Sequence, residues 1–177
     1  FASAQGYAAL EDRIDVGNFI DYSIQEIWSG NTDWPGNNVR LWRAVTANRS
    51  VGANPRHDGR WRWILYDTDF ALGLDFSYVP GWNTDASQSA QFDSLGHATA
   101  SSGSFWSNNE VATRLLRKSL DNATFRQRFI NRFADLLNTT LSGTAAAATL
   151  SAFESAYAPG MVEHVNRWRQ PFNWSAE

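Results

Sequence analysis

The chain has 177 residues, 43% of them hydrophobic and 14% aromatic, with a formal net charge of −3 at pH 7. This length and apolar content allow a sizeable core, which argues against a disordered chain and favours a single domain over residues 1–177. The 15 basic residues are scattered, which argues against nucleic-acid binding, and the absence of cysteine excludes disulfides and thiolate metal sites. No apolar run is long enough for membrane insertion, and the sequence leaves the oligomeric state open.

The first predicted helix begins after Asp15 and ends at Gly30. Aspartate is a common helix N-cap, and glycine commonly ends a helix. Apolar residues recur on one face of this helix: Val16, Phe19, Ile20, Ile24, Ile27 and Trp28. Residues 1–12, which are small and polar, fit the end of a helix or a linker.

Two acidic motifs flank a predicted β-hairpin. The first, residues 31–38, is too rich in Asn, Gly and Pro for regular structure. Residues 39–45 and 60–70 alternate in character and predict two antiparallel strands joined by a polar loop. The second strand would place five side chains on one face: Trp61, Trp63, Leu65, Asp67 and Asp69. Residues 66–70, at its end, form the second acidic motif.

Residues 71–105 show no periodicity and predict a lid, a binding loop or a disordered segment. Strong helix signals follow. Ser107 and Glu110 form a capping-box pattern that opens one helix. Asp121 or Asn122 can cap the next helix, whose apolar stripe comprises Phe125, Phe129, Ile130, Phe133, Leu136 and Leu137.

The C-terminal part is predicted to be helical as well. Gly143 ends the preceding helix, an alanine-rich helix covers residues 144–157, and Pro159 suits the first turn of a last helix. The tail after Pro171 has no regular pattern. The expected fold is therefore α+β and mainly α, with a small antiparallel β-hairpin that carries the acidic motifs.

Four residues are the first candidates for chemistry: Asp33, Asn38, Asp67 and Asp69. Their carboxylate and amide oxygens favour a hard cation such as Mg²⁺ or Mn²⁺. Two carboxylates that alternate along one strand lie only about 7 Å apart, so a divalent ion would relieve their repulsion. Bound phosphates would complete the coordination of such an ion.

This combination is what phosphoryl transfer needs. In a protein kinase, an Asp orients or deprotonates the acceptor hydroxyl, an Asn five residues later holds a metal ion, and an Asp at a strand end holds the metal that bridges the phosphates. Asp33 and Asn38 match the Asp-x-x-x-x-Asn spacing. Asp69-Phe70 matches the start of the Asp-Phe-Gly turn, with Ala71 in place of the glycine. Asn31-Thr32 stands where His-Arg usually precedes the catalytic Asp.

Several motifs resemble those of the CotH family of atypical, kinase-like proteins. They are Asn18-Phe19-Ile20-Asp21-Tyr22, residues 30–38, residues 60–70 and Arg167-Trp168. The resemblance covers most of the chain. It implies a kinase-like C-terminal lobe, the use of Mg²⁺ and ATP, and phosphorylation of Ser or Thr in a protein substrate. Because the family is named for a bacterial spore-coat protein, secreted, cell-surface and spore-coat locations stay open.

The resemblance also implies a role for each site residue. Asp33 is expected to be the catalytic-loop Asp and Asp69 the metal-binding Asp. Asn38 and Asp67 are expected to be supporting metal ligands. Trp63 is a candidate for a different reason: it lies two steps before Asp67 on the same predicted strand face, where it could flank a nucleotide.

The resemblance is incomplete in one respect. A kinase nucleotide site also uses a Gly-rich loop and a lysine on a strand of the N-terminal lobe. Neither precedes Asp33, and the only lysine, Lys118, falls in a late predicted helix. We therefore expect the chain to be a fragment of a longer protein whose upstream part supplies the nucleotide lobe. We expect these 177 residues alone to bind Mg²⁺-ATP weakly or not at all and to show no measurable kinase activity.

Structural roles compete with these assignments. Asp33 could close a turn before Pro-Gly, Asp67 could bond loop amides, and Trp61 and Trp63 could fill the core. The histidines are widely spaced and carry no predicted catalytic role: His57, His97 and His164.

Two other function classes also stay open. Asp67-Thr68-Asp69 after an apolar strand would suit a metal-dependent glycosyltransferase, although that site normally follows several strand-helix units. A non-catalytic binding or structural module of a bacterial surface or coat protein would use tryptophans to contact a glycan or a protein. Exposed tryptophans would favour the binding module, and buried ones would count against it.

Overall fold

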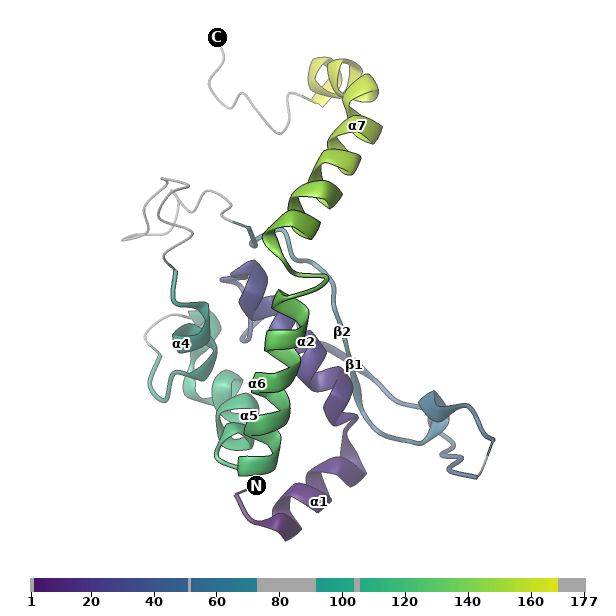
Figure 1. Cartoon of the computed structure of the whole chain (residues 1–177), viewed down its shortest axis with the longest axis vertical. Helices are drawn as coiled ribbons and strands as arrows, with labels where there is room; N and C mark the ends of the chain where they lie inside the picture. The colour runs from purple at the N-terminus through teal and green to yellow at the C-terminus, as the bar shows by residue number, and fades with distance from the viewer. Residues whose placement is uncertain (1, 51, 73–91, 104–105, 169–177) are drawn as a thin grey trace. The chain divides into compact units, whose positions relative to one another are not determined.

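A computed structural model describes residues 2–50, 52–72, 92–103 and 106–168 (Figure 1). The chain separates into two compact units, residues 1–133 and 134–177. The described residues form mainly helices and one two-stranded antiparallel sheet, which confirms the expected α+β, mainly α class. The single-domain assignment stays a prediction. None of the helices in these ranges combines the length and apolar character that crossing a membrane requires.

Helix α2 (Val16–Ser29) is the central element of the first unit. It begins where Asp15 Oδ1 accepts the N–H of Asn18 at 3.1 Å, and it ends at Gly30, whose φ is +66°. Both predicted ends are confirmed. Residues buried on several sides of α2, rather than on a single stripe, are Val16, Phe19, Ile20, Tyr22, Ser23, Ile24, Glu26 and Ile27.

Helix α1 (Ala4–Arg13) precedes α2, so most of residues 1–12 are helical rather than a linker. Its N-cap is Ser3, whose Oγ accepts the N–H of Gly6 at 3.0 Å. After α1 the chain extends, and Ile14 forms an isolated bridge with Trp61.

The predicted hairpin is present but shorter than expected. Strand β1 (Arg40–Trp42) pairs antiparallel with β2 (Arg62–Ile64), with Leu41 opposite Trp63. The prediction that a strand runs to residue 70 is wrong, because Asp67 adopts a φ of +54°, in the left-handed region that ends an extended run. The second acidic motif is consequently a turn, and Asp67 and Asp69 do not share a strand face.

The side chain of Asn18 joins α2 to β2. Its Oδ1 accepts the N–H of Trp63 at 2.6 Å, and its Nδ2 donates to the carbonyl of Trp63 at 3.3 Å. Trp63 is buried, and its ring lies 4.5 Å from that of Phe19. Phe19 in turn lies 6.1 Å from Phe125 of a later helix. Hydrogen bonds and aromatic packing therefore fix the hairpin on α2.

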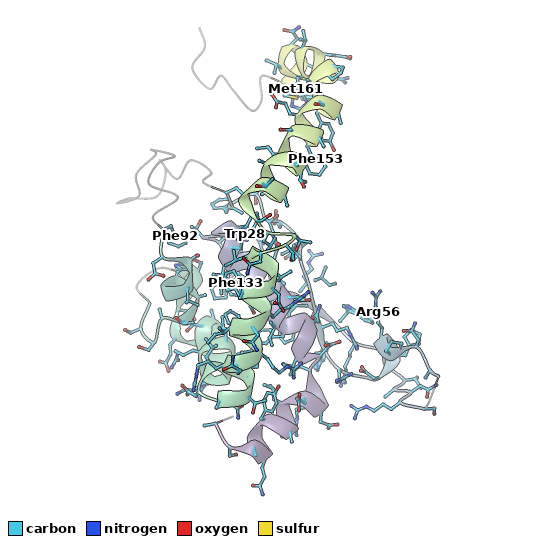
Figure 2. The ribbon with its side chains drawn as sticks, in the orientation of Figure 1. Trp28, Arg56, Phe92, Phe133, Phe153 and Met161 are labelled. Carbon is cyan, nitrogen blue, oxygen red and sulfur yellow. The ribbon has the colours of Figure 1, made fainter. Side chains whose placement is uncertain are left out.

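A buried arginine organises the loop between β1 and β2, which contains the short helix η1 (Pro55–His57) and is marked by Arg56 in Figure 2. Arg62 donates to both carboxylate oxygens of Asp58, at 3.0 and 3.1 Å, and to Asp15 at 3.0 Å. The pKa of Asp58 is lowered: burial opposes this shift, but the bonds from Arg62 and Arg60 outweigh it.

Residues 71–105 are only partly described. Residues 73–91, where the prediction of a lid or binding loop falls, lie outside the described residues. The absence of periodicity was misleading for the rest, because α4 (Ser94–Thr99) forms there with Asp93 as its N-cap. A six-residue helix is too short to produce a periodic pattern.

Two longer helices follow η2 (Trp106–Asn108). Helix α5 (Glu110–Leu120) is capped by Asn109 rather than by Ser107, because Asn109 Oδ1 accepts the N–H groups of Val111 and Ala112. Asn122 caps α6 (Ala123–Leu137), as predicted. In the apolar stripe of α6, Phe125 and Phe129 are buried, whereas Ile130 and Leu137 are exposed.

The second unit contains α7 (Gly143–Trp168), along which Figure 2 labels Phe153 and Met161. The prediction of two helices divided near Pro159 is wrong, since the helix is continuous with Pro159 inside it. Proline removes one helical hydrogen bond, while the alanine-rich turns before it favour helix strongly. The predicted irregular tail after Pro171 lies outside the described residues.

Candidate functional site

The first acidic motif is a buried, hydrogen-bonded loop at the C-terminal end of α2. Asp33 is only 5% exposed. Its Oδ2 accepts the side-chain amides of Asn37 at 2.9 Å and Asn38 at 2.6 Å. Asn38 has a φ of +53°, a conformation that asparagine tolerates better than most residues. The loop therefore holds the Asp33 carboxylate in a defined orientation.

A second set of bonds fixes the backbone of this loop from inside the protein. Asn31 Oδ1 accepts the N–H of Asp33 at 3.1 Å, and Asn31 Nδ2 donates to Glu26 Oε2 at 2.8 Å. Glu26 is 1% exposed, and burial raises its pKa. Near it, the buried Tyr22 hydroxyl also has a raised pKa, first because of burial and then because of Glu26. Asp33 is thus backed by a buried polar cluster.

The loop is also attached to the segment around α4 and η2. His97 Nε2 lies 2.9 Å from the carbonyl of Trp34, and Ser107 Oγ donates to the carbonyl of Thr32 at 2.5 Å. Gly36 lies so close to Ser107 that an added Cβ would come within 2.6 Å of the Ser107 carbonyl oxygen. The sequence predicted no role for His97, whose buried position lowers its pKa.

The second acidic motif lies beside the first and is held by backbone groups. The N–H of Thr32 donates to the carbonyl of Phe70 at 3.3 Å, and Asn38 Nδ2 lies 3.3 Å from the carbonyl of Asp67. The N–H of Leu72 donates to the carbonyl of Ser29 at 2.7 Å. The side chains of Asp67 and Asp69 are exposed. Two motifs about 30 residues apart in the chain therefore meet next to α2.

The pKa of Asp33 depends on its burial and on its neighbours, which include the second motif. Burial raises the pKa of Asp33, and the hydrogen bond from Asn37 opposes this shift. The charges of Asp69 and then of Asp67 raise the pKa of Asp33 further. The second motif therefore disfavours the charged form of Asp33.

The structure brings four of the predicted site residues together: Asp33, Asn38, Asp67 and Asp69. It places Trp63 differently, 9% exposed against Phe19 and Tyr22 in the core. The role of Trp63 toward a nucleotide stays a prediction. Lys118, the only lysine of the sequence, lies on α5, and its Nζ forms an ion pair at 3.1 Å with Asp121, which follows the end of that helix.

Two cavities, of about 580 and 490 Å³, lie instead along the loop between β1 and β2. The acidic residues among their lining are Glu11, Asp12, Asp15, Asp21 and Asp58, and neither cavity includes any of the predicted site residues.

A comparison with protein families shows which family the whole chain belongs to. A family profile described as CotH kinase protein matches residues 2–177. The chain belongs to the CotH kinase family. The match extends over the acidic loop, the hairpin and all the described helices of this CotH chain, which confirms the resemblance seen in its motifs. A search of the curated proteins and a search of the solved structures each returned no match to the CotH chain.

Proposed function

We propose that this chain carries the acceptor-orienting and metal-binding part of a phosphoryl-transfer site that phosphorylates Ser or Thr in a protein substrate, with Mg²⁺ or Mn²⁺ and ATP. One observation carries the proposal. The Asp-x-x-x-x-Asn loop and the Asp69 turn are joined by the bond from Thr32 to Phe70, and the charge of Asp69 raises the pKa of Asp33. Membership of a kinase-like family supports it.

The donor chemistry of the site fits a hard divalent cation. Asn38 uses Nδ2 to bond Asp33, which leaves its Oδ1 for a cation, and the exposed carboxylates of Asp69 and Asp67 supply anionic oxygens. Among the described residues, no group of three or more His, Cys, Asp or Glu is placed to hold a metal ion. A kinase-type site needs fewer protein ligands, because phosphate oxygens and water supply the others.

In this proposal the residues of the chain divide the work. Both side-chain amides bond Oδ2 of Asp33, so we assign Oδ1 to the acceptor hydroxyl. Oδ1 would accept the hydroxyl proton as the hydroxyl oxygen bonds to the γ-phosphorus, while the bond from that phosphorus to the β,γ-bridging oxygen breaks and ADP leaves. The raised pKa of Asp33 makes it a better base than an exposed aspartate. Asp69 and Asn38 would hold the divalent ion, which neutralises charge on the phosphates when it is bound.

The test is phosphate transfer from radiolabelled ATP by the natural full-length protein. Asp33→Asn is expected to lower transfer by about 10²- to 10⁴-fold, the usual contribution of a positioned acid-base group. Asp69→Ala removes a proposed metal ligand and is also expected to abolish most of the transfer. Asp135→Asn, on the exposed surface of α6, is the matched control and should transfer at the wild-type rate. Full transfer by either site variant would overturn the proposal. A binding module would instead retain its ligand in both variants.

A further inference from the structure

Glu26 is a buried carboxylate at a position where a helix would ordinarily place an apolar residue. It is 1% exposed on α2, between the buried residues Ser23 and Ile27. Burying a carboxyl group is costly unless the group is hydrogen-bonded. The partner of Glu26 is Asn31, which donates from Nδ2 to Oε2 at 2.8 Å and from its backbone N–H to the Glu26 carbonyl at 3.1 Å.

The carboxamide of Asn31 is held from both ends. Its Oδ1 must face Asp33, because the backbone N–H there can only donate. Its Nδ2 then faces Glu26, because the carboxylate can only accept. The two contacts fix one orientation of the amide, and they form a continuous chain from the Glu26 carboxylate through Asn31 to the Asp33 backbone.

This chain of bonds holds a different part of Asp33 from the part held by the amides of Asn37 and Asn38. Those amides hold the carboxylate, whereas Asn31 holds the backbone to which the carboxylate is attached. Asn31 is 2% exposed, so its bonds are protected from water. A shift of the Asp33 backbone would move Oδ1 relative to an acceptor hydroxyl.

We propose that Glu26 and Asn31 are positioning residues of the phosphoryl-transfer site: the Glu26 carboxylate orients the Asn31 carboxamide, which in turn sets the backbone, and hence the aim, of Asp33. The proposal rests on the proposed function.

The experiment measures kcat and the KM for ATP in the natural full-length protein. Glu26→Leu removes the acceptor for Asn31 and should lower kcat by about 10- to 100-fold, the effect of a catalytic group displaced by roughly 1 Å, while the KM for ATP stays at the wild-type value. Glu26→Gln keeps a neutral acceptor and should hold kcat within about threefold of the wild type. Ser23→Ala, one turn earlier on α2, removes a buried hydroxyl that has no bond to the loop and is the control.

If Glu26→Leu yields too little folded protein, Asn31→Asp answers the same question. Aspartate keeps the acceptor for the Asp33 N–H but cannot donate to Glu26, so the same fall in kcat is expected. A folded Glu26→Leu or Asn31→Asp protein with wild-type kcat would overturn the inference. Equal losses in Glu26→Gln and Glu26→Leu would also overturn it, since a positioning bond is restored by the conservative variant.

The two proposals fail in different ways. If Asp33→Asn retains full transfer, the proposed function itself is wrong. If Asp33→Asn abolishes transfer but Glu26→Leu does not change kcat, the function holds and only the positioning role is wrong.

Discussion

The two acidic motifs are built in opposite ways. Residues 31–38 form a buried loop in which Asp33 is 5% exposed and is bonded through both its carboxylate and its backbone. Residues 66–70 form a turn that backbone groups hold in place, with the carboxylates of Asp67 and Asp69 exposed. The core therefore fixes the orientation of Asp33 in the first motif, whereas the second motif exposes the charges of Asp67 and Asp69 to solvent.

The largest effect on stability is expected from the buried loop. Trp34 is 3% exposed and packs edge-on against Tyr22 at 6.0 Å, so Trp34→Ala should lower the free energy of unfolding by about 3–5 kcal/mol. Urea unfolding followed by circular dichroism measures the change. Trp168→Ala, at an exposed position, should change it by about 0.5 kcal/mol or less. Equal losses in the two variants would remove the distinction between buried and exposed tryptophans.

A smaller loss is expected from the close approach of the loop to η2. A Cβ on Gly36 would lie 2.6 Å from the Ser107 carbonyl oxygen, and backbone atoms cannot move aside cheaply. Gly36→Ala should therefore lower the free energy of unfolding by roughly 1–3 kcal/mol. Gly143→Ala is the matched control, because its added Cβ would meet open space among the described residues, apart from its chain neighbours and the adjacent turn of its own helix. If both glycines tolerate alanine equally, the loop is less tightly packed than the geometry indicates.

The exposed turn should respond differently. Asp67→Asn and Asp69→Asn remove charges that repel Asp33, and asparagine tolerates the positive φ of position 67. Either change should leave the free energy of unfolding within about 0.5 kcal/mol of the wild type at pH 7. A loss of several kcal/mol would mean that these carboxylates are structural, which is the alternative that the sequence left open for Asp67.

The smallest expected effect is a change in the pKa of Asp33 when the charges of the second motif are removed. Because the charges of Asp69 and Asp67 raise the pKa of Asp33, the double variant Asp67→Asn/Asp69→Asn should lower that pKa, as measured by carboxyl NMR titration. Asp135→Asn should not change the pKa of Asp33.

The raised pKa of Asp33 also links stability to pH, because in the wild type the folded state holds the Asp33 proton more tightly than the unfolded state does. The protonation of Asp33 therefore contributes most to stability below the ordinary aspartate pKa of about 4. This contribution is lost as the pH rises through the raised pKa of Asp33 in the folded state.

Sequence reasoning predicted the local features of this fold well. Asp15 and Gly30 specify the ends of α2 through short-range bonds, and Asn122 caps α6 in the same way. The acidic motifs were found because their residue types and spacing are local too. The end of β2 was missed because pairing stops at Ile64, opposite the first residue of β1, and Asp67 has a positive φ, whereas the side-chain alternation continues to residue 70.

The support behind the site could not be predicted in this way. Glu26, His97 and Ser107 act through bonds to the loop that depend on how distant segments pack. One signal for Glu26 was present: it lies four residues after Tyr22 on a helix whose buried residues extend well beyond one stripe. A charged residue on such a helix indicates a buried partner, although the sequence does not identify it.

We propose that the two motifs together form one site for a divalent cation. Titrating the chain with Mn²⁺ and recording paramagnetic broadening of its NMR spectrum tests this claim most directly, since broadening detects weak binding. We predict that the Asn38 side-chain amide and the backbone resonances of Asp69 broaden together at the same Mn²⁺ concentration, and that Asp69→Ala abolishes both effects. Broadening of one motif without the other, or persistence of both effects in Asp69→Ala, would contradict a shared site.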